Sequence, residues 1–213
     1  MEFEGFQASD FEVFEVPGFD ERMHAVKTVL SPKFERLGHD LAPRLTEVLG
    51  VPMYSHVAKH ARRTVNPPKD SWVAISGDKR GYKKHPHFEI GAWRTHAFAL
   101  FGLLYEAADR AHFAEKIKMN AEVLLEHFPP GYVWIPDHTN PEGIQGRDVT
   151  PTRLKELAQR MTTTRNGELL VGIQVPKADA AHMKASEFEQ AVMVCFTKIK
   201  PLFRMATMEA VTR

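Results

Sequence analysis

The feature that most constrains the fold is a block of three β-type runs in the middle of the chain, with helix-forming segments on both sides. The runs cover residues 72–76, 87–93 and 96–105 and are rich in aromatic and aliphatic side chains. The third run is apolar almost throughout, so its pattern fits a buried strand or a core helix equally well. This order predicts an α+β protein and not the regular βαβ alternation of a dinucleotide-binding fold.

The flanking segments show helical spacing. Val26 and Leu30 fall on one helical face, and Ser31 is expected to cap a helix that Gly38 ends, with a further short helix after it. Apolar stripes predict later helices over residues 109–128, from 151 and from 186 onward. Short strands are expected over 132–135 and 168–175.

We therefore expect one α+β domain over residues 1–213, with a largely antiparallel sheet and helices packed on one of its faces. The length of 213 residues suits a single core. The expected core contains twelve residues: Phe34, Leu37, Trp72, Ile75, Phe88, Ile90, Phe98, Leu103, Ile117, Leu124, Val192 and Phe196.

Several classes of protein are disfavoured by what the sequence lacks. The single cysteine, Cys195, cannot form an internal disulfide, and it lies in an apolar run that predicts a buried, inert thiol. The first residues are acidic where an export signal is basic. The longest apolar stretch is far shorter than the roughly 20 residues of a membrane-spanning helix. We expect a cytoplasmic protein with no membrane partner.

Charge is distributed unevenly although the chain as a whole carries only +1. The segment 56–87 contains eight Lys or Arg residues against two Asp residues, which gives it +6 before any histidine is protonated. The remainder of the chain therefore carries −5. A basic block in a mildly acidic protein focuses positive potential on one region, and such regions attract polyanions.

Two stretches in this block, 54–68 and 78–89, carry the main functional hypothesis. Gly81 is flanked by lysine and arginine, and its backbone can turn amides toward an anion, while Tyr82 offers a ring on which a base could stack. The hypothesis is a cleft for a phosphate-bearing ligand, either nucleic acid or a nucleotide. A solvated loop that only keeps the protein soluble is the alternative. The predicted anion-binding residues are His56, Lys59, His60, Arg62, Arg63, Lys79, Arg80, Tyr82, Lys83, Lys84 and His87.

A metal-dependent hydrolase is a second hypothesis, because His56 and His60 would share a face, as would His85, His87 and Glu89. These five residues are the alternative metal ligands. A third hypothesis is a protein–protein module without a catalytic site, which requires a large exposed apolar patch.

Asp137 and His138 are interpreted as a capped turn. The sequence assigns no catalytic residue, no cofactor and no oligomeric state, and whether the protein is an enzyme stays open.

The same stretches resemble a known family. The run Tyr54-Ser55-His56-Val57-Ala58-Lys59-His60-Ala61-Arg62-Arg63-Thr64-Val65-Asn66-Pro67-Pro68, then Trp72-Val73-Ala74 and Lys79-Arg80-Gly81-Tyr82-Lys83-Lys84-His85-Pro86-His87-Phe88, is similar to the YktB-like bacterial proteins. These are grouped as domain of unknown function 1054 and uncharacterised protein family 0637. The residues around Phe11 and Phe34 are also similar. The resemblance implies a bacterial, cytoplasmic, whole-length domain, and it supplies no reaction and no catalytic residues.

Overall fold

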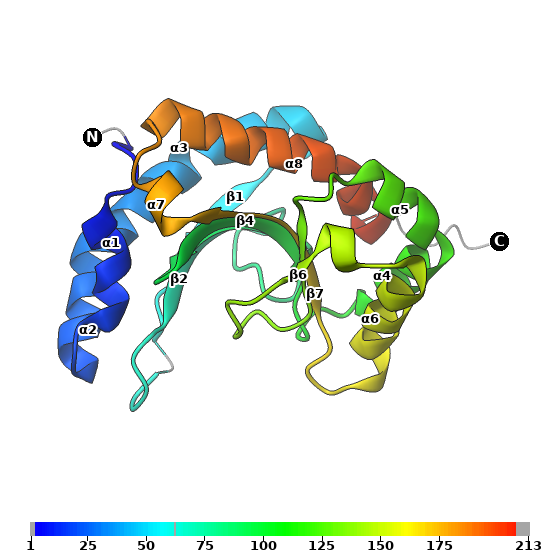
Figure 1. Ribbon diagram of the computed structural model, residues 1–213, viewed down its shortest axis with the longest axis horizontal. Coiled ribbons are helices and arrows are strands. Elements are labelled where there is room, and N and C mark those ends of the chain that lie inside the picture. The colour runs from blue at the N-terminus through cyan, green and yellow to red at the C-terminus, as the bar shows by residue number, and fades with distance from the viewer. Residues whose placement is uncertain (1–2, 62, 208–213) are drawn as a thin grey trace.

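A sheet that arches across the molecule organises the fold in this computed structural model, which describes residues 3–61 and 63–207 (Figure 1). The described residues form seven strands in the spatial order β1-β2-β3-β4-β7-β5-β6, and every neighbouring pair is antiparallel. The third β-type run, left open between strand and helix, is the strand β4. The strands are β1 Tyr54–Val57, β2 Asp70–Ser76, β3 His87–Trp93, β4 His96–Leu103, β5 Val133–Ile135, β6 Ile144–Gln145 and β7 Leu169–Pro176.

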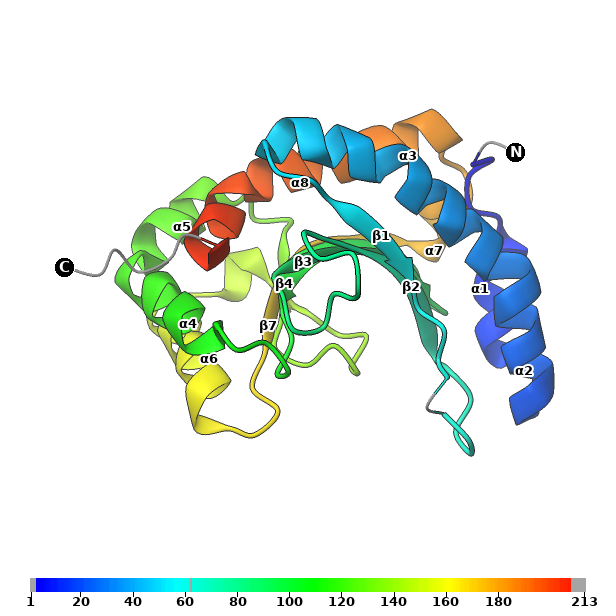
Figure 2. The same ribbon diagram turned by 180° about the vertical axis from the view of Figure 1, so that it is seen from behind.

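The helices are distributed unequally around the sheet. The long helices α3 and α8 lie across the convex side of the arch, while loops occupy most of the concave side (Figures 1 and 2). The short helices α1 and α2 lie at one end, and α4, α5 and α6 lie at the other. The helices are α1 Ala8–Glu12, α2 Phe19–Ala25, α3 Ser31–Leu49, α4 Arg110–Met119, α5 Ala121–His127, α6 Pro151–Thr163, α7 Lys177–Ala180 and α8 Ala185–Thr207, with a π-helix at Val26–Leu30 and 3-10 turns at Val13–Glu15 and Gly146–Asp148.

The alternation of side chains along each strand explains why helices cover one face. On β3, Phe88 and Ile90 point into the main core, whereas His87 and Glu89 point to the concave side because successive residues alternate. All twelve expected core residues are buried. Trp72 and Phe98 belong to a smaller apolar cluster on the concave side, and the other ten belong to the main core. The expected α+β class and antiparallel sheet are therefore confirmed.

Three expected helix boundaries are wrong. The chain is helical without interruption from Phe19 to Leu49, so Ser31 caps nothing and Gly38 does not end a helix. Gly38 instead lets α3 approach the sheet, because a Cβ there would lie 2.7 Å from Ser55 Cβ and 2.8 Å from Val73 Cγ2. The expected helix over 109–128 is broken at Asn120, whose side-chain amide donates to the carbonyl of Lys116.

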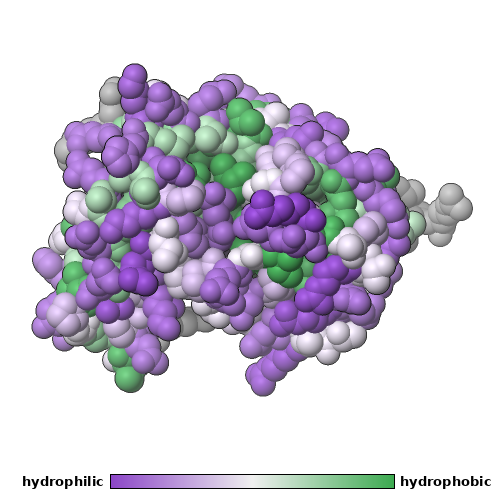
Figure 3. All heavy atoms as spheres, in the orientation of Figure 1, coloured by the Kyte–Doolittle hydropathy of each residue, from purple (hydrophilic) through white to green (hydrophobic). Residues whose placement is uncertain are grey.

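Three further features concern membrane-spanning potential, the single cysteine and the surface. No helix in the described residues combines the length and apolar character needed to cross a membrane. Cys195 is buried as expected, and burial raises the pKa of its thiol to about 12. Hydrophilic residues cover most of the face shown in Figure 3, and hydrophobic residues show in a few separate places.

Candidate functional site

A groove of about 930 Å³ opens on the concave side of the sheet. Its walls are three loop segments: the connection from β1 to β2, the loop from β2 to β3, and the turn that follows β5. Trp72 on β2 contributes to its floor. We call this the concave-face groove, and its lining residues are Val57, Ala58, Lys59, His60, Ala61, Arg63, Trp72, Asp78, Arg80, Gly81, Tyr82, Lys83, Lys84, His85 and His138.

The groove lining carries five lysine or arginine side chains, all of them exposed, against the single carboxylate of Asp78. Lys83 lies 4.0 Å from Glu106 Oε2, a long ion pair. Within the described part of the chain, Arg63 and Lys84 form no salt bridge. Cations without carboxylate partners keep their charge available to an anion that enters the groove.

His60 occupies an unusual backbone conformation at one wall of the groove. Its φ is 49°, and it is the one non-glycine residue with positive φ among the described residues. Such strain costs about 1–3 kcal/mol and occurs mostly at functional sites. The ring packs edge-on against Trp72, and Nε2 lies 3.2 Å from Ser71 Oγ. Burial, with the nearby charges of Arg63 and Lys83, lowers its pKa to about 4, so the imidazole is neutral at pH 7.

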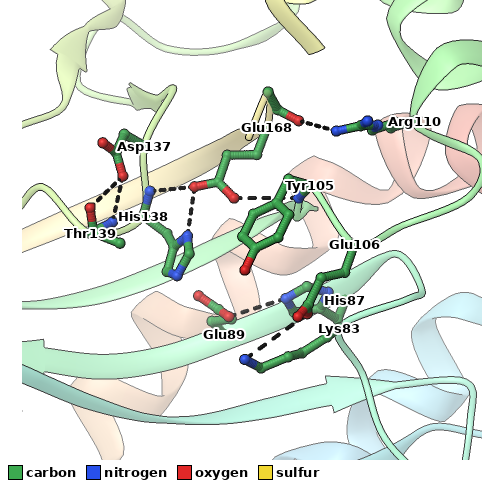
Figure 4. Close-up of polar contacts among 11 residues, drawn as sticks. Lys83, His87, Glu89, Tyr105, Glu106, Arg110, Asp137, His138, Thr139 and Glu168 are labelled. Carbon is green, nitrogen blue, oxygen red and sulfur yellow. Dashed lines mark hydrogen bonds and ion pairs between the residues drawn. The ribbon is translucent and has the colours of Figure 1, made fainter. Parts of the chain in front are cut away.

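His138 at another wall is held in place by a buried carboxylate. Both its backbone N–H and Nδ1 bond to Glu168 Oε1, at 2.7 and 2.6 Å. Burial opposes the imidazolium, but the bond to Glu168 and the charges of Glu168, Glu89 and Asp70 outweigh it and raise the pKa of His138. Figure 4 shows the ring between the carboxylates of Glu168 and Glu89. These surroundings therefore favour the protonated form of His138, and its Nε2 forms no hydrogen bond with a described residue.

Further carboxylates are buried under the groove. Asp70 and Glu89 line a second, enclosed cavity of about 10 Å³ that His138 also borders, a volume near that of one water molecule. Burial raises the pKa of Asp70 to about 7, against the attraction of Arg63 and His138 and with the repulsion of Glu89. Glu89 Oε1 lies 3.1 Å from His87 Nε2. Groups that titrate near neutrality beside a groove are the usual equipment of acid–base chemistry.

The structure gathers most of the predicted anion-binding residues into the groove. Those that line it are Lys59, His60, Arg63, Arg80, Tyr82, Lys83 and Lys84. His56 and Lys79 do not line it: His56 Nε2 donates to the Asp78 carbonyl at 2.8 Å, and Lys79 lies over the Tyr54 ring. His87 is fully buried beneath the groove. Arg62 lies outside the described residues.

The five alternative metal ligands do not form one group. His85 Nε2 lies 3.5 Å from Asp78 Oδ2, His60 bonds to Ser71, and His87 and Glu89 pair with each other. Among the described residues, the one set of three side chains whose ligand atoms lie within 4.8 Å of one another is Asp137, His138 and Glu168. The Asp137 carboxylate also accepts bonds from Thr139 N and Oγ1, which is the capped turn expected there.

Another cavity, larger than the concave-face groove, lies elsewhere. It measures about 1310 Å³ and is bordered by α3, α5 and α8 on the convex side. Its lining mixes aliphatic residues such as Val194 and Met205 with charged residues such as Arg44 and Lys200. The exposed large hydrophobic side chains among the described residues come from separate elements: Val29, Val51, Val65, Tyr105, Met119, Val123 and Val194.

Sequence reasoning missed Asp70 and Glu168 and treated His138 only as part of a turn. Thirty positions separate His138 from Glu168, so no local spacing connects them. A usable signal existed: Asp70 and Glu168 are acidic residues directly at the start of apolar strands. An acidic residue at the start of a strand is usually exposed, so a buried one indicates a specific role. Both Asp70 and Glu168 are buried.

Comparison with known proteins places the chain in a family. The family described as "Domain of unknown function (DUF1054)" matches residues 6–203. A UPF0637 protein of Bacillus velezensis is 42% identical over 200 residues, covering 94% of this chain and 95% of the relative. UPF0637 proteins of Bacillus cytotoxicus and Lysinibacillus sphaericus are each 40% identical, covering 96% and 92% of this chain and 99% and 92% of their own lengths. The resemblance noted in the basic stretches is thereby confirmed, and the chain belongs to the DUF1054 (UPF0637) family.

Proposed function

We propose that this protein binds a phosphate-bearing ligand, a nucleic acid or a nucleotide, in the concave-face groove, as a protein of the bacterial cytoplasm. The observation that carries the proposal is the composition of the groove lining. Lys59, Arg63, Arg80, Lys83 and Lys84 come from two separate loops and border one cavity. Cations that merely kept the protein soluble would have no reason to converge on one concave surface.

The shape of the groove also supports a ligand of nucleotide size. A volume of about 930 Å³ is at the upper end of the range for small-molecule sites. Tyr82 and Trp72 add aromatic surface to the lining, which suits a nucleobase, and the arginines offer forked donors that suit phosphate. The proposed arrangement places phosphates on the loop cations and a base against the aromatic floor.

Binding titrations test this proposal. Fluorescence anisotropy would be measured with a labelled single-stranded RNA, a labelled duplex DNA and a panel of nucleotides as competitors, each at two salt concentrations. With about four neutralised phosphates, a single strand should show a log–log salt slope of roughly −3. The double variant Arg80→Ala/Lys83→Ala should weaken affinity roughly tenfold and make the slope shallower by about 1.4.

A matched control separates the groove from overall charge. Lys27 and Arg165 are exposed and lie outside the groove lining, so Lys27→Ala/Arg165→Ala removes the same charge. This control should retain wild-type affinity. If the wild type binds none of the probes below about 100 μM, a threshold equivalent to roughly 5.5 kcal/mol, or both double variants bind alike, the proposed function fails.

A further inference from the structure

The concave-face groove contains two histidines whose pKa values are shifted in opposite directions. His60 is neutral at pH 7, because burial and the charges of Arg63 and Lys83 disfavour its imidazolium. The pKa of His138 is raised, because the bond to Glu168 and the charges of Glu168, Glu89 and Asp70 favour its imidazolium more than burial disfavours it. Both line the same groove. A pair of titratable groups whose surroundings separate their pKa values in this way is the usual form of a general base and a general acid.

The geometry of each histidine fits its role. The bond from Nδ1 to Glu168 at 2.6 Å fixes the orientation of the His138 ring and leaves Nε2 as the nitrogen that can donate to a ligand. His60 makes one hydrogen bond, between Nε2 and Ser71 Oγ, and in the tautomer in which Nε2–H donates this bond, Nδ1 accepts a proton. The positive φ of His60 is an independent indication that packing alone does not explain where this residue lies.

The groove also has groups that suit a charged transition state. Arg63 and Lys83 border it near His60, since both influence the titration of that ring. Positive side chains fixed beside a phosphate stabilise the additional negative charge that develops when a fifth oxygen attacks phosphorus. With a base, an acid and cations in one groove, a nucleophile is the remaining requirement, and RNA contains its own in the ribose 2′-hydroxyl.

We propose that His60 and His138 act as general base and general acid in cleaving single-stranded RNA bound in the concave-face groove, an inference that rests on the proposed function. His60 takes the proton of a 2′-hydroxyl while the 2′-oxygen forms a bond to the adjacent phosphorus. The bond from phosphorus to the 5′-oxygen breaks, and His138 gives its proton to that leaving oxygen. The products are one strand ending in a 2′,3′-cyclic phosphate and one beginning with a 5′-hydroxyl. The step consumes no water and needs no metal.

The experiment combines cleavage and binding on the same RNA. A 5′-labelled single-stranded RNA is incubated with the full-length protein in EDTA, and its products are resolved and tested for a cyclic phosphate end. An all-2′-deoxy strand of the same sequence serves as the substrate without a nucleophile. The wild type should cleave RNA and leave the deoxy strand intact.

Variants assign the two roles. His138→Gln and His60→Asn should each lower the cleavage rate at least about 100-fold and change RNA affinity less than about threefold. Asparagine is chosen at position 60 because it tolerates positive φ, so folding is preserved. His39→Gln, at an exposed position on α3, is the control and should cleave like the wild type.

The pH profile adds a readout that a purely structural role would not affect. The wild-type rate should fall below about pH 4, when His60 gains a proton, and again above the raised pKa of His138. Arg63 and Lys83 face His60, whereas Glu168, Glu89, Asp70 and Asp137 face His138. Glu168→Gln removes one of these carboxylates, so the alkaline limb should shift to lower pH. Glu168 is thus a positioning residue.

The outcomes separate the two proposals. RNA binding without cleavage in EDTA overturns the catalytic inference and leaves the proposed function intact. Cleavage of the deoxy strand, or cleavage that persists in both histidine variants, also overturns the inference. Failure to bind RNA or any nucleotide overturns both.

Discussion

The two faces of the central sheet are built from alternate residues of the same strands and have opposite characters. On β3, Phe88 and Ile90 face α3 and α8 in a continuous apolar core, while His87 and Glu89 lie on the concave side among other titratable groups. The convex face gains free energy by burying hydrocarbon. The concave face also buries a smaller apolar cluster, but the desolvation of titratable groups there offsets part of the free energy gained. From this contrast we expect substitutions on the convex face to affect mainly stability, and we place the proposed function on the concave face.

The largest effect should follow from truncating the convex face. Phe88 is fully buried, and its ring centroid lies 4.7 Å from that of Phe196 and 4.8 Å from that of Phe101. Phe88→Ala should lower the free energy of unfolding by about 3–5 kcal/mol, measured by urea denaturation. Val123→Ala, at an exposed site on α5, should change it by less than about 0.5 kcal/mol. A loss below about 1 kcal/mol for Phe88→Ala would contradict the assignment.

The concave face should behave in the opposite way, because neutralising a buried charge there stabilises the protein. The pKa of Asp70 is about 7 in the folded state against an ordinary 3.8, so the unfolded chain releases this proton first. Stability is therefore lost as pH rises from 3.8 through 7, and the cost is complete above 7.

Asp70→Asn should remove that cost. We expect it to raise the free energy of unfolding at pH 8 by about 1–4 kcal/mol and to change it little at pH 4. Urea denaturation of both proteins at the two pH values measures the difference. Asp179→Asn, at an exposed site on α7, is the matched control and should show no such pH-dependent gain. A variant that is destabilised equally at both pH values would show that the Asp70 side chain supports the fold whether or not it is charged.

Close packing on the convex face leads to a third prediction. A methyl group at Gly38 would lie 2.7 Å from Ser55 Cβ, which is too short for a normal contact. Gly38→Ala should therefore lower the free energy of unfolding by about 1–3 kcal/mol, although alanine is the better helix former by about 1 kcal/mol. Glu35→Ala, exposed on the same helix, should be near neutral. A stabilised Gly38→Ala protein would mean that α3 can move away from β1.

The smallest effect on stability should come from the groove rim. Arg80 and Lys83 are exposed, so Arg80→Ala/Lys83→Ala should change the free energy of unfolding by less than about 0.5 kcal/mol. The same variant should weaken ligand binding roughly tenfold. Thermal melts and binding titrations on one preparation test both statements together. A large loss of stability would show that these cations support the loop itself.

Sequence patterns predicted much of the fold because the responsible forces are local. Apolar spacing identified the strands of the central block and all twelve expected core residues, since burial of alternating side chains leaves a direct trace in the sequence. The boundaries at Ser31 and Gly38 were wrong because serine, proline and glycine usually punctuate helices. At Gly38 the packing of α3 on Ser55 and Val73 requires a glycine within the helix.

The candidate site, like the fold, was predicted only in part from the sequence. Charge counting located the loop cations, because eight lysines and arginines in one short segment are visible without a structure. Folding decided which of them share a groove, and it directed His56 and Lys79 elsewhere through contacts with Asp78 and Tyr54.

The sequence by itself determined the central strands, the apolar core and the concentration of positive charge, because each depends on neighbouring residues. Only the tertiary structure placed His138 against Glu168 and buried Asp70 and Glu89 beneath the groove. The physical reason is that a pKa depends on burial and on charges a few ångströms away. Those neighbours come from β2, β3 and the segments around β5 and β7, which only the folded sheet brings together.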